Sequence, residues 1–201
     1  MSGERGESAD YALEQPQVAK LLAACSTLED KVLIGCQLWL GLRVSELVHT
    51  RADWITSEGN FRVPAQQKCT CSECLAKGSD TWRPKTRASI RTLPISSTLR
   101  KDLLEFLRQR PNGFQLSRQS LYYRTKTLLK KARIRVRGLA DDTIFPHALR
   151  STCAQMLALG GMSAAGLCAF MGWRSIAIGD HYIRASKAKE LAMTEARRIF
   201  G

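Results

Sequence analysis

Apolar side chains recur every three or four residues along most of this 201-residue chain, and this spacing constrains the fold more than any other feature. The period places them on one face of an α-helix. Helices are expected over residues 16–25, 27–40, 44–50, 97–108, 118–134, 146–159, 163–171 and 187–200. Between residues 53 and 95 the pattern changes to short strand-like runs at 54–55, 61–63 and 89–95. The sequence therefore predicts an α+β, mostly helical fold, with a small antiparallel β-sheet or hairpin inserted between helices.

Length and composition favour one domain, which we place at residues 12–201 behind a polar N-terminal tail at residues 1–11. Hydrophobic residues make up 44% of the chain, which argues against wholesale disorder. No apolar run reaches the ~18 residues that a membrane-spanning helix needs, and residues 1–10 do not resemble a secretion signal. The seven cysteines are then expected to stay reduced, in the cytoplasm.

The basic charge is concentrated in one part of the chain. The segment from Arg83 to Arg137 holds 16 of the 31 Lys and Arg residues but only 2 of the 18 acidic residues. Solvated helix faces normally mix both signs, so a one-sided surplus favours a polyanionic partner, most simply nucleic acid. Binding to a membrane surface is disfavoured because the basic segment has no matching amphipathic helix with exposed Trp or Phe.

Three cysteines, Cys69, Cys71 and Cys74, cluster in a polar segment. Three thiolates at this spacing can hold a structural zinc ion, but such a site needs a fourth ligand, and the sequence offers no second pair of cysteines. The alternative is an exposed hairpin insertion that carries reduced thiols. The other four cysteines lie on apolar helical faces and are expected in the core.

Four short motifs carry side chains suited to chemistry. They are GLRVSEL at 41–47, PKT at 84–86 followed by RTLPI at 91–95, PHALR at 146–150, and MGWRSI at 171–176 with Tyr182 nine residues beyond Trp173. Each has an ordinary explanation when taken alone. Arg43 and Glu46 can form a helical ion pair, and Trp173 and Tyr182 can be core aromatics.

Together and in this order, the motifs resemble the catalytic domain of the tyrosine recombinase (phage integrase) family. Residues 41–47 resemble its first arginine box, Lys85 its β-hairpin lysine, and residues 147–150 its His-x-x-Arg box. Trp173 and Tyr182 have the family's His/Trp-to-tyrosine spacing. The resemblance covers residues 12–200. It implies a site-specific recombinase or integrase that cleaves and rejoins duplex DNA through a covalent 3′-phosphotyrosine intermediate.

The sequence departs from the family pattern in three places. A separate core-binding domain usually precedes the catalytic one, and we expect it to be absent from this chain because residues 1–13 are too few. Trp173 stands where His is commoner. The insertion that holds Cys69, Cys71 and Cys74 is not part of the general pattern and resembles some archaeal integrases.

The chemistry of strand cleavage needs the side chains that the motifs supply. Tyr182 provides a phenol as nucleophile, while Arg43 and Arg150 offer charged donor forks for the phosphate oxygens. Lys85 can protonate the leaving 5′-oxygen, and His147 and Trp173 can support the phosphate. Glu46 is expected to orient Arg43. The 3′-phosphotyrosyl link stores the energy of the broken phosphodiester bond, so no metal or ATP is expected for catalysis. The sequence also has no P-loop.

Double-stranded DNA is therefore the expected partner, contacted along its backbone by a basic helix that starts at Arg118. The candidate DNA-binding residues are Arg83, Arg87, Arg118, Arg124, Lys126, Lys130, Lys131, Arg133 and Arg135. The resemblance implies a nucleoid-associated protein, monomeric when free, that forms a synaptic tetramer on DNA. The C-terminal helix would dock on a neighbouring protomer or pack on its own domain. Two other functions stay open: a type IB topoisomerase-like nicking-closing enzyme, and a non-catalytic DNA-binding regulator with the same fold.

Overall fold

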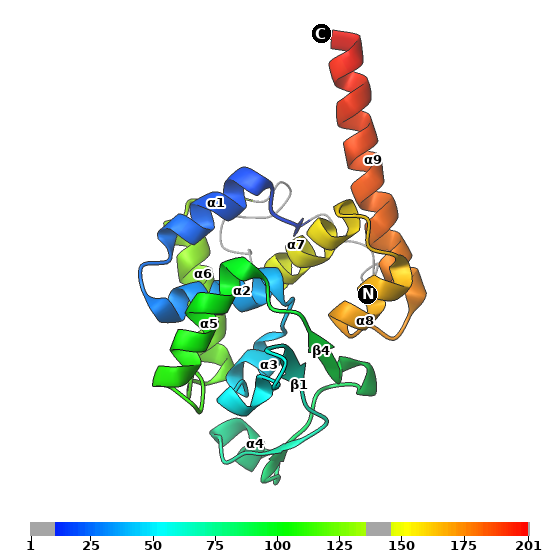
Figure 1. Ribbon diagram of the computed structural model, residues 1–201. Helices are drawn as coiled ribbons and strands as arrows, with labels where there is room; N and C mark the ends of the chain where they lie inside the picture. The colour runs from blue at the N-terminus through cyan, green and yellow to red at the C-terminus, as the bar shows by residue number, and fades with distance from the viewer. Residues whose placement is uncertain (1–10, 136–145, 201) are drawn as a thin grey trace.

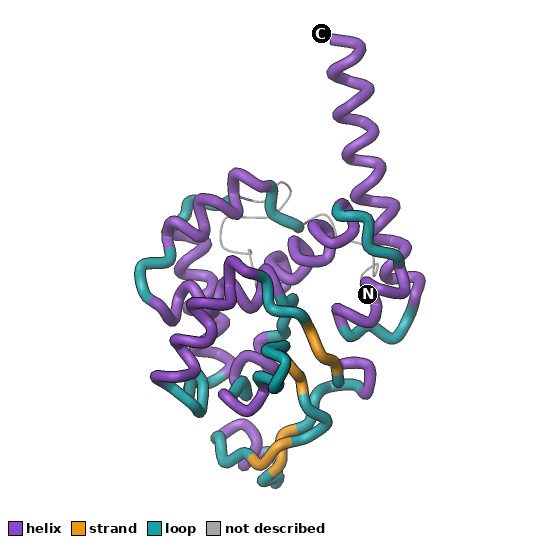
Figure 2. Tube along the Cα trace, in the orientation of Figure 1, coloured by secondary structure: helices purple, strands orange, loops and turns teal. Residues whose placement is uncertain are grey.

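The computed structural model describes residues 11–135 and 146–200, and helices dominate it (Figure 1). Short 3₁₀ turns, η2 (Ala52–Trp54) and η3 (Arg87–Ser89), and four short strands interrupt the helices between α3 and α5 (Figure 2). The helices are α1 (Gln15–Ala24), α2 (Leu28–Trp39), α3 (Val44–Val48), α4 (Ser72–Ala76), α5 (Ser97–Gln109), α6 (Arg118–Lys131), α7 (Pro146–Leu159), α8 (Ala164–Met171) and α9 (Ile176–Phe200). The predicted fold class, mostly helical with small antiparallel sheets, is confirmed.

Helix ends follow the capping residues in the sequence. The Thr27 hydroxyl accepts from the backbone N–H of Asp30 at 3.1 Å and starts α2. Ser163 caps α8 in the same way, with Gly166 as donor at 3.1 Å. Gly172 ends α8 in the left-handed conformation, with φ of 65°, where a side chain would be strained and would crowd Ser89. Gly172 thus brings the end of α8 close to the strand region.

The sheet region consists of two small antiparallel pairs. Strand β1 (Phe61–Val63) pairs with β4 (Arg91–Leu93), and β2 (Gln67–Lys68) pairs with β3 (Thr81–Trp82). The prediction of a strand at 54–55 is confirmed only at Ile55, which forms an isolated antiparallel bridge with Phe61. It is wrong at Trp54, which belongs to η2 and has a buried ring. Along the chain, β2, α4 and β3 all lie between β1 and β4. This segment extends away from the domain body and returns to β4 (Figure 2).

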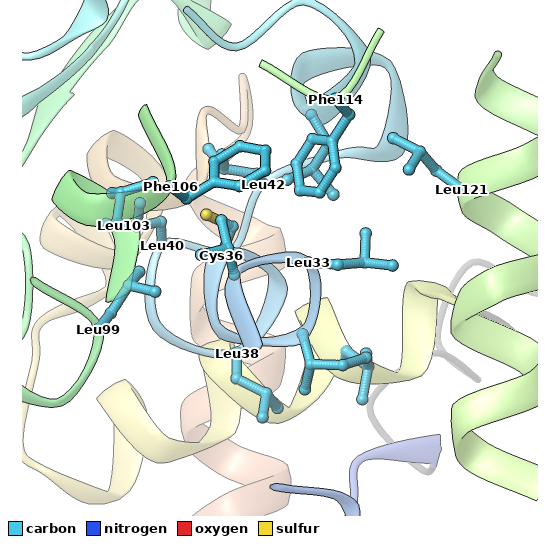
Figure 3. Close-up of a cluster of buried hydrophobic side chains, with 14 of the residues drawn as sticks. Leu33, Cys36, Leu38, Leu40, Leu42, Leu99, Leu103, Phe106, Phe114 and Leu121 are labelled. Atoms are coloured by element: carbon cyan, nitrogen blue, oxygen red, sulfur yellow. The ribbon is translucent and has the colours of Figure 1, made fainter. Parts of the chain in front are cut away.

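The core forms around α2, which is buried on nearly every side. Figure 3 shows Leu33, Cys36 and Leu38 of α2 surrounded by side chains of neighbouring helices. Helix α5 packs closely on α2, since a Cβ on Gly35 would come within 2.7 Å of the Leu99 side chain. Truncating a fully buried leucine in such a core costs about 2–5 kcal/mol. The core thus fixes α2, and with it the loop to α3 at residues 40–43.

Helix α9 begins at Ile176, eleven residues before the predicted start at 187, and therefore carries Tyr182. The prediction followed apolar residues in the last part of the helix, whereas its buried face begins with Gly179, Tyr182 and Ser186, which are not aliphatic. Gly179 allows close contact with the backbone of Ala164 on α8. The C-terminal half of α9 projects away from the domain (Figure 1). Among the described residues, no helix is both long and apolar enough to cross a membrane.

Candidate active site

Arg43 and Glu46 lie at the start of α3 and contact each other directly. Glu46 accepts from the Arg43 backbone N–H at 3.0 Å and from Arg43 Nη1 at 2.9 Å. Arg43 also donates to Ser89 Oγ at 2.9 Å and to the Gly172 carbonyl at 3.1 Å. These bonds come from three separate segments and hold the guanidinium in one orientation.

A third arginine, to which the sequence analysis assigned no role, completes this cluster. Arg91 on β4 is buried and donates to both carboxylate oxygens of Glu46, at 3.0 and 3.2 Å. Burial alone would raise the pKa of Glu46, but the charges of Arg91, Arg150 and Arg43 hold it below its ordinary value. The strand alternation offered a signal, since Arg91 shares the inward face of β4 with Leu93. A charged residue on that face needs a buried partner.

Arg150 occupies the first turns of α7 and is 4% exposed. It donates to the carbonyls of Gly41, in the loop before α3, and Met171, the last residue of α8. Burial and the nearby Arg43 guanidinium lower the pKa of Arg150 to about 9, so the side chain stays charged at neutral pH. The guanidinium also lies 5.9 Å from the centre of the Trp173 ring, a cation–π distance.

Four of the six predicted catalytic residues line one open pocket of about 510 Å³: Arg43, Lys85, His147 and Arg150. Residues Arg118 and Tyr122 of α6 line it as well. Desolvation and the positive charges of Arg150, Arg43 and Lys85 lower the pKa of His147. Four basic groups around one concave surface form a site suited to a phosphate.

Trp173 and Tyr182 do not line this pocket. Their rings stack with centroids 5.0 Å apart at an interplanar angle of 21°. Tyr182 is only 4% exposed, and its hydroxyl lies 2.9 Å from Ser151 Oγ on α7. Ser151 was not identified from the sequence. The six predicted side chains thus form one neighbourhood, but the phenol is packed beside the pocket, and not in it.

The basic side chains of α6 fall on two sides of the helix. The i, i+4 row Arg118, Tyr122, Lys126 and Lys130 starts at the pocket, and Lys126 lies 5.9 Å from the Tyr122 ring centre. Arg124 is on the other side and differs from expectation. It donates to Asp30 at 2.7 Å and to Glu29 at 2.5 Å, and these acids offset its charge inside the domain.

The remaining candidate DNA-binding residues are exposed. Lys131 donates to the Ala24 carbonyl at 3.0 Å, on the same side of α6 as Arg124, and so supports the end of α1. Arg137, the predicted end of the basic segment, is outside the described residues. The exposed side chains are those of Arg83, Arg87, Arg118, Lys130, Lys131, Arg133 and Arg135.

The clustered cysteines meet a fourth donor that the sequence analysis missed, His49. The donor atoms of His49, Cys69, Cys71 and Cys74 all lie within 4.8 Å of one another. Cys69 and Cys74 are buried, which corrects the alternative of an exposed thiol insertion. His49 follows α3 directly, at the opposite end from Arg43. The sequence signal was a histidine just after a short buried helix, with nothing to indicate its distant partners.

Comparisons with known proteins agree on the fold. The chain resembles the crystal structure of XerA recombinase (TM-score 0.67, 16% identity), covering 91% of this chain and 63% of that one. It also resembles a Tn1549 transposon integrase in complex with transposon right-end DNA (TM-score 0.65, 19% identity), covering 91% and 66%. The chain thus spans about two thirds of the length of each. A comparison with curated protein sequences finds no match.

A third structure matches over nearly equal lengths. The catalytic domain of bacteriophage HP1 integrase shares 19% identity and a TM-score of 0.55, with 87% of both chains covered. The sequence model described as the phage integrase family matches residues 12–189, which include all six predicted catalytic residues. This chain therefore belongs to the phage integrase family, the tyrosine recombinases.

Proposed function

We propose that this chain is the catalytic domain of a site-specific DNA recombinase or integrase. One observation carries the proposal: Arg43, Lys85, His147 and Arg150, from four separate segments, line a single pocket. The Tyr182 hydroxyl contacts Ser151, the residue after Arg150. Family membership adds that such domains act in DNA strand exchange. The chain spans 63% of the XerA recombinase chain. We therefore propose a complete recombination cycle only for this domain together with the further protein parts that such a cycle needs.

In the proposed reaction a backbone phosphate occupies the pocket. Each guanidinium has five N–H donors, and the protein contacts above use three of those on Arg43 and two on Arg150. The remaining donors can bind the non-bridging oxygens, whose charge increases as phosphorus becomes five-coordinate. Glu46 and backbone carbonyls already hold the guanidiniums of Arg43 and Arg150 in place. Little reorganisation of these two groups is therefore needed when a phosphate binds.

The nucleophile is Tyr182. Its phenol gives a proton to the neutral imidazole of His147 as its oxygen forms a bond to phosphorus. The bond to the 5′-oxygen breaks, and Lys85 gives that oxygen a proton. The product is a 3′-phosphotyrosyl link and a free 5′-hydroxyl. Attack by the hydroxyl of a second strand reverses the step and restores Tyr182, so rejoining needs no added energy source.

The geometry requires Tyr182 to move before it attacks. Its hydroxyl contacts Ser151 and its ring is stacked on Trp173, whereas Tyr182 is not among the residues that line the phosphate pocket. We propose that DNA binding shifts the first turns of α9 so that the hydroxyl exchanges Ser151 for the phosphate. The bond to Ser151 that this shift breaks contributes about 0.5–1.5 kcal/mol, the usual range for one neutral hydrogen bond.

Self-association on DNA is the proposed use of the projecting end of α9. Four large apolar side chains there, Leu191, Met193, Ile199 and Phe200, are between 58% and 85% exposed. Their exposure in the described part of the chain disfavours packing of this end of α9 on its own domain. Docking on a neighbouring protomer is then the proposed alternative. Sedimentation with and without a cognate duplex tests this, and a monomer in both conditions contradicts it.

The DNA path along α6 is tested by a matched pair of substitutions. Lys126→Gln removes a charge from the row that starts at the pocket, so the slope of log affinity against log salt should fall by about one unit. Arg124→Gln removes a charge that Glu29 and Asp30 already neutralise, so it should lower stability and leave the salt slope unchanged. Equal salt slopes for the two variants contradict this orientation of α6.

The catalytic proposal is tested with a nicked suicide duplex, which traps a covalent complex because the cleaved fragment diffuses away. Wild-type protein should form an adduct that resists denaturant, and Tyr182→Phe should form none while it binds DNA normally. The burial of Tyr182 is the observation that favours a non-catalytic DNA-binding regulator. Tight binding without an adduct on any candidate site supports that regulator. Relaxation of a supercoiled plasmid without strand exchange supports a nicking-closing enzyme.

A further inference from the structure

We propose that His49, Cys69, Cys71 and Cys74 form a structural zinc site that joins α3 to the segment leading to Lys85. His49 Nε2 lies 3.4 Å from Cys74 Sγ and 3.5 Å from Cys71 Sγ. A tetrahedral zinc with bonds of about 2.3 Å to sulfur and 2.0–2.1 Å to nitrogen holds such ligand atoms roughly 3.5 Å apart. The widest donor pair, at 4.8 Å, needs to close by only about 1 Å.

The hydrogen bonds of His49 present the correct nitrogen to the sulfur atoms. Its Nδ1 lies 2.7 Å from the Ser45 carbonyl, which can only accept a hydrogen bond. Nδ1 therefore carries the hydrogen, and Nε2 directs its lone pair toward Cys71 and Cys74. Zinc-bound histidines are commonly oriented in this way, with the second ring nitrogen donating to a carbonyl.

The cysteine segment is also arranged for a metal. The backbone N–H of Cys71 donates to Cys69 Sγ at 3.4 Å, a bond that orients this sulfur within the cluster. The N–H of Cys69 donates to the Asp80 carbonyl at 2.7 Å, so the two ends of the segment from residue 69 to residue 80 are hydrogen-bonded to each other. The donor set of three sulfurs and one imidazole is a common set for structural zinc.

A packing cluster without metal is a poorer account of the same residues. Three thiols are weak hydrogen-bond partners for a buried imidazole nitrogen. The hairpin that carries them has only two paired residues in each strand, and such a hairpin is marginal in water. A zinc ion bound by Cys69, Cys71 and Cys74 would supply the missing stability directly, because binding free energy becomes folding free energy.

The consequence for catalysis rests on the proposed function. Trp82, at the end of β3, stacks on the His49 ring with centroids 4.8 Å apart. Lys85 follows three residues later and reaches the phosphate pocket. The proposed zinc thus fixes the path of the chain into Lys85, while Arg43 lies at the other end of α3. Zinc is here a positioning group that holds the proton donor in place.

Metal content tests the site without reference to DNA. Full-length protein purified without chelator should contain one zinc per chain. After zinc removal, added Co²⁺ should give the absorption bands of tetrahedral cobalt with thiolate ligands. Cys71→Ser should lose both signals, and Cys168→Ser, which changes a buried cysteine elsewhere, should keep both. Far less than one zinc per chain in the wild type, with no thiolate–cobalt bands, overturns the proposal.

The role in positioning Lys85 is tested with two DNA duplexes. One carries a normal scissile phosphate, and the other has sulfur as the bridging 5′-atom, whose thiolate leaves without a proton. Zinc removal should slow cleavage of the normal duplex by about 100-fold or more, and should leave the sulfur duplex almost unaffected. Equal slowing of both contradicts the positioning role. If neither duplex is cleaved by zinc-loaded protein, the proposed function fails and the zinc measurement still stands.

Discussion

The two halves of the proposed active centre differ in how ready they are for a substrate. The phosphate half, with Arg43, Lys85, His147 and Arg150, opens on a pocket. The nucleophile half, Trp173 and Tyr182, is packed against α7, and Tyr182 is 4% exposed. The comparison shows that the contacts that orient the basic groups are separate from the packing that covers Tyr182. Bonds inside the protein hold the basic groups, and we propose that access of the phenol to the phosphate depends on a movement of α9.

The largest effect should come from removing the carboxylate at the centre of the phosphate half. Glu46 is 1% exposed and binds both Arg43 and Arg91. Glu46→Gln leaves neighbouring guanidiniums without their counter-charge and should reduce the free energy of unfolding by about 3–5 kcal/mol. Urea unfolding measures this loss. Glu105→Gln, in an exposed pair with Arg108, is the control and should change the free energy of unfolding far less, because solvent screens this pair. Similar losses would mean that the buried cluster is not a special source of stability.

The second effect concerns catalysis by the same half. Arg150→Lys keeps a positive charge but removes the planar donor fork, and should slow single-turnover cleavage by about 100- to 1,000-fold. The matched control is Arg62→Lys, at an exposed position outside the pocket, which should change the rate little. A reduction of less than about tenfold for Arg150→Lys would remove this guanidinium from the proposed transition-state contacts.

The nucleophile half should respond in the opposite direction when its packing is loosened. Ser151→Ala removes the hydrogen bond that holds the Tyr182 hydroxyl away from the pocket. It should cost about 1 kcal/mol of stability and increase the rate of adduct formation several-fold, because the phenol leaves its site more easily. Thermal unfolding and a time course on the suicide duplex measure both quantities. Slower adduct formation in a folded variant would assign Ser151 a role in the reaction.

The smallest effect is a pH dependence of DNA binding. Desolvation and nearby cations lower the pKa of His147 in the free protein. A phosphate in the pocket offsets those cations and raises this pKa, so binding takes up a proton and tightens as pH falls. Between about pH 8 and about pH 6 the affinity should rise two- to tenfold at constant ionic strength. His147→Gln should remove most of that rise, and an unchanged rise would assign it to another group.

Much of the fold follows from local patterns, whereas parts of the site depend on contacts between distant residues. Periodicity and capping residues such as Thr27 and Ser163 were enough to predict most helices. Motif order was enough to select the six candidate catalytic residues. The contacts that sequence reasoning missed join distant residues: Arg91 to Glu46 across 45 positions, Cys74 to His49 across 25, and Tyr182 to Ser151 across 31. No local pattern encodes such pairs.

The same limit explains the misplaced start of α9. Its buried face begins with Gly179, which lies against the backbone of Ala164. Glycine weakens a helix by about 1 kcal/mol in isolation, and only close packing between two helices makes its small size an advantage. Sequence patterns show the low helix propensity of glycine but not the close packing that makes glycine favourable here. Burial of Tyr182 follows from this packing, so access of the phenol to solvent could not be predicted.

The most direct test is to identify the atom that joins protein to DNA. The adduct from a suicide duplex, digested with protease and nuclease, should give one peptide that contains Tyr182 with its phenol linked to a 3′-phosphate, found by tandem mass spectrometry. Any other linked residue, or a 5′-phosphate link at Tyr182, would contradict the proposed mechanism.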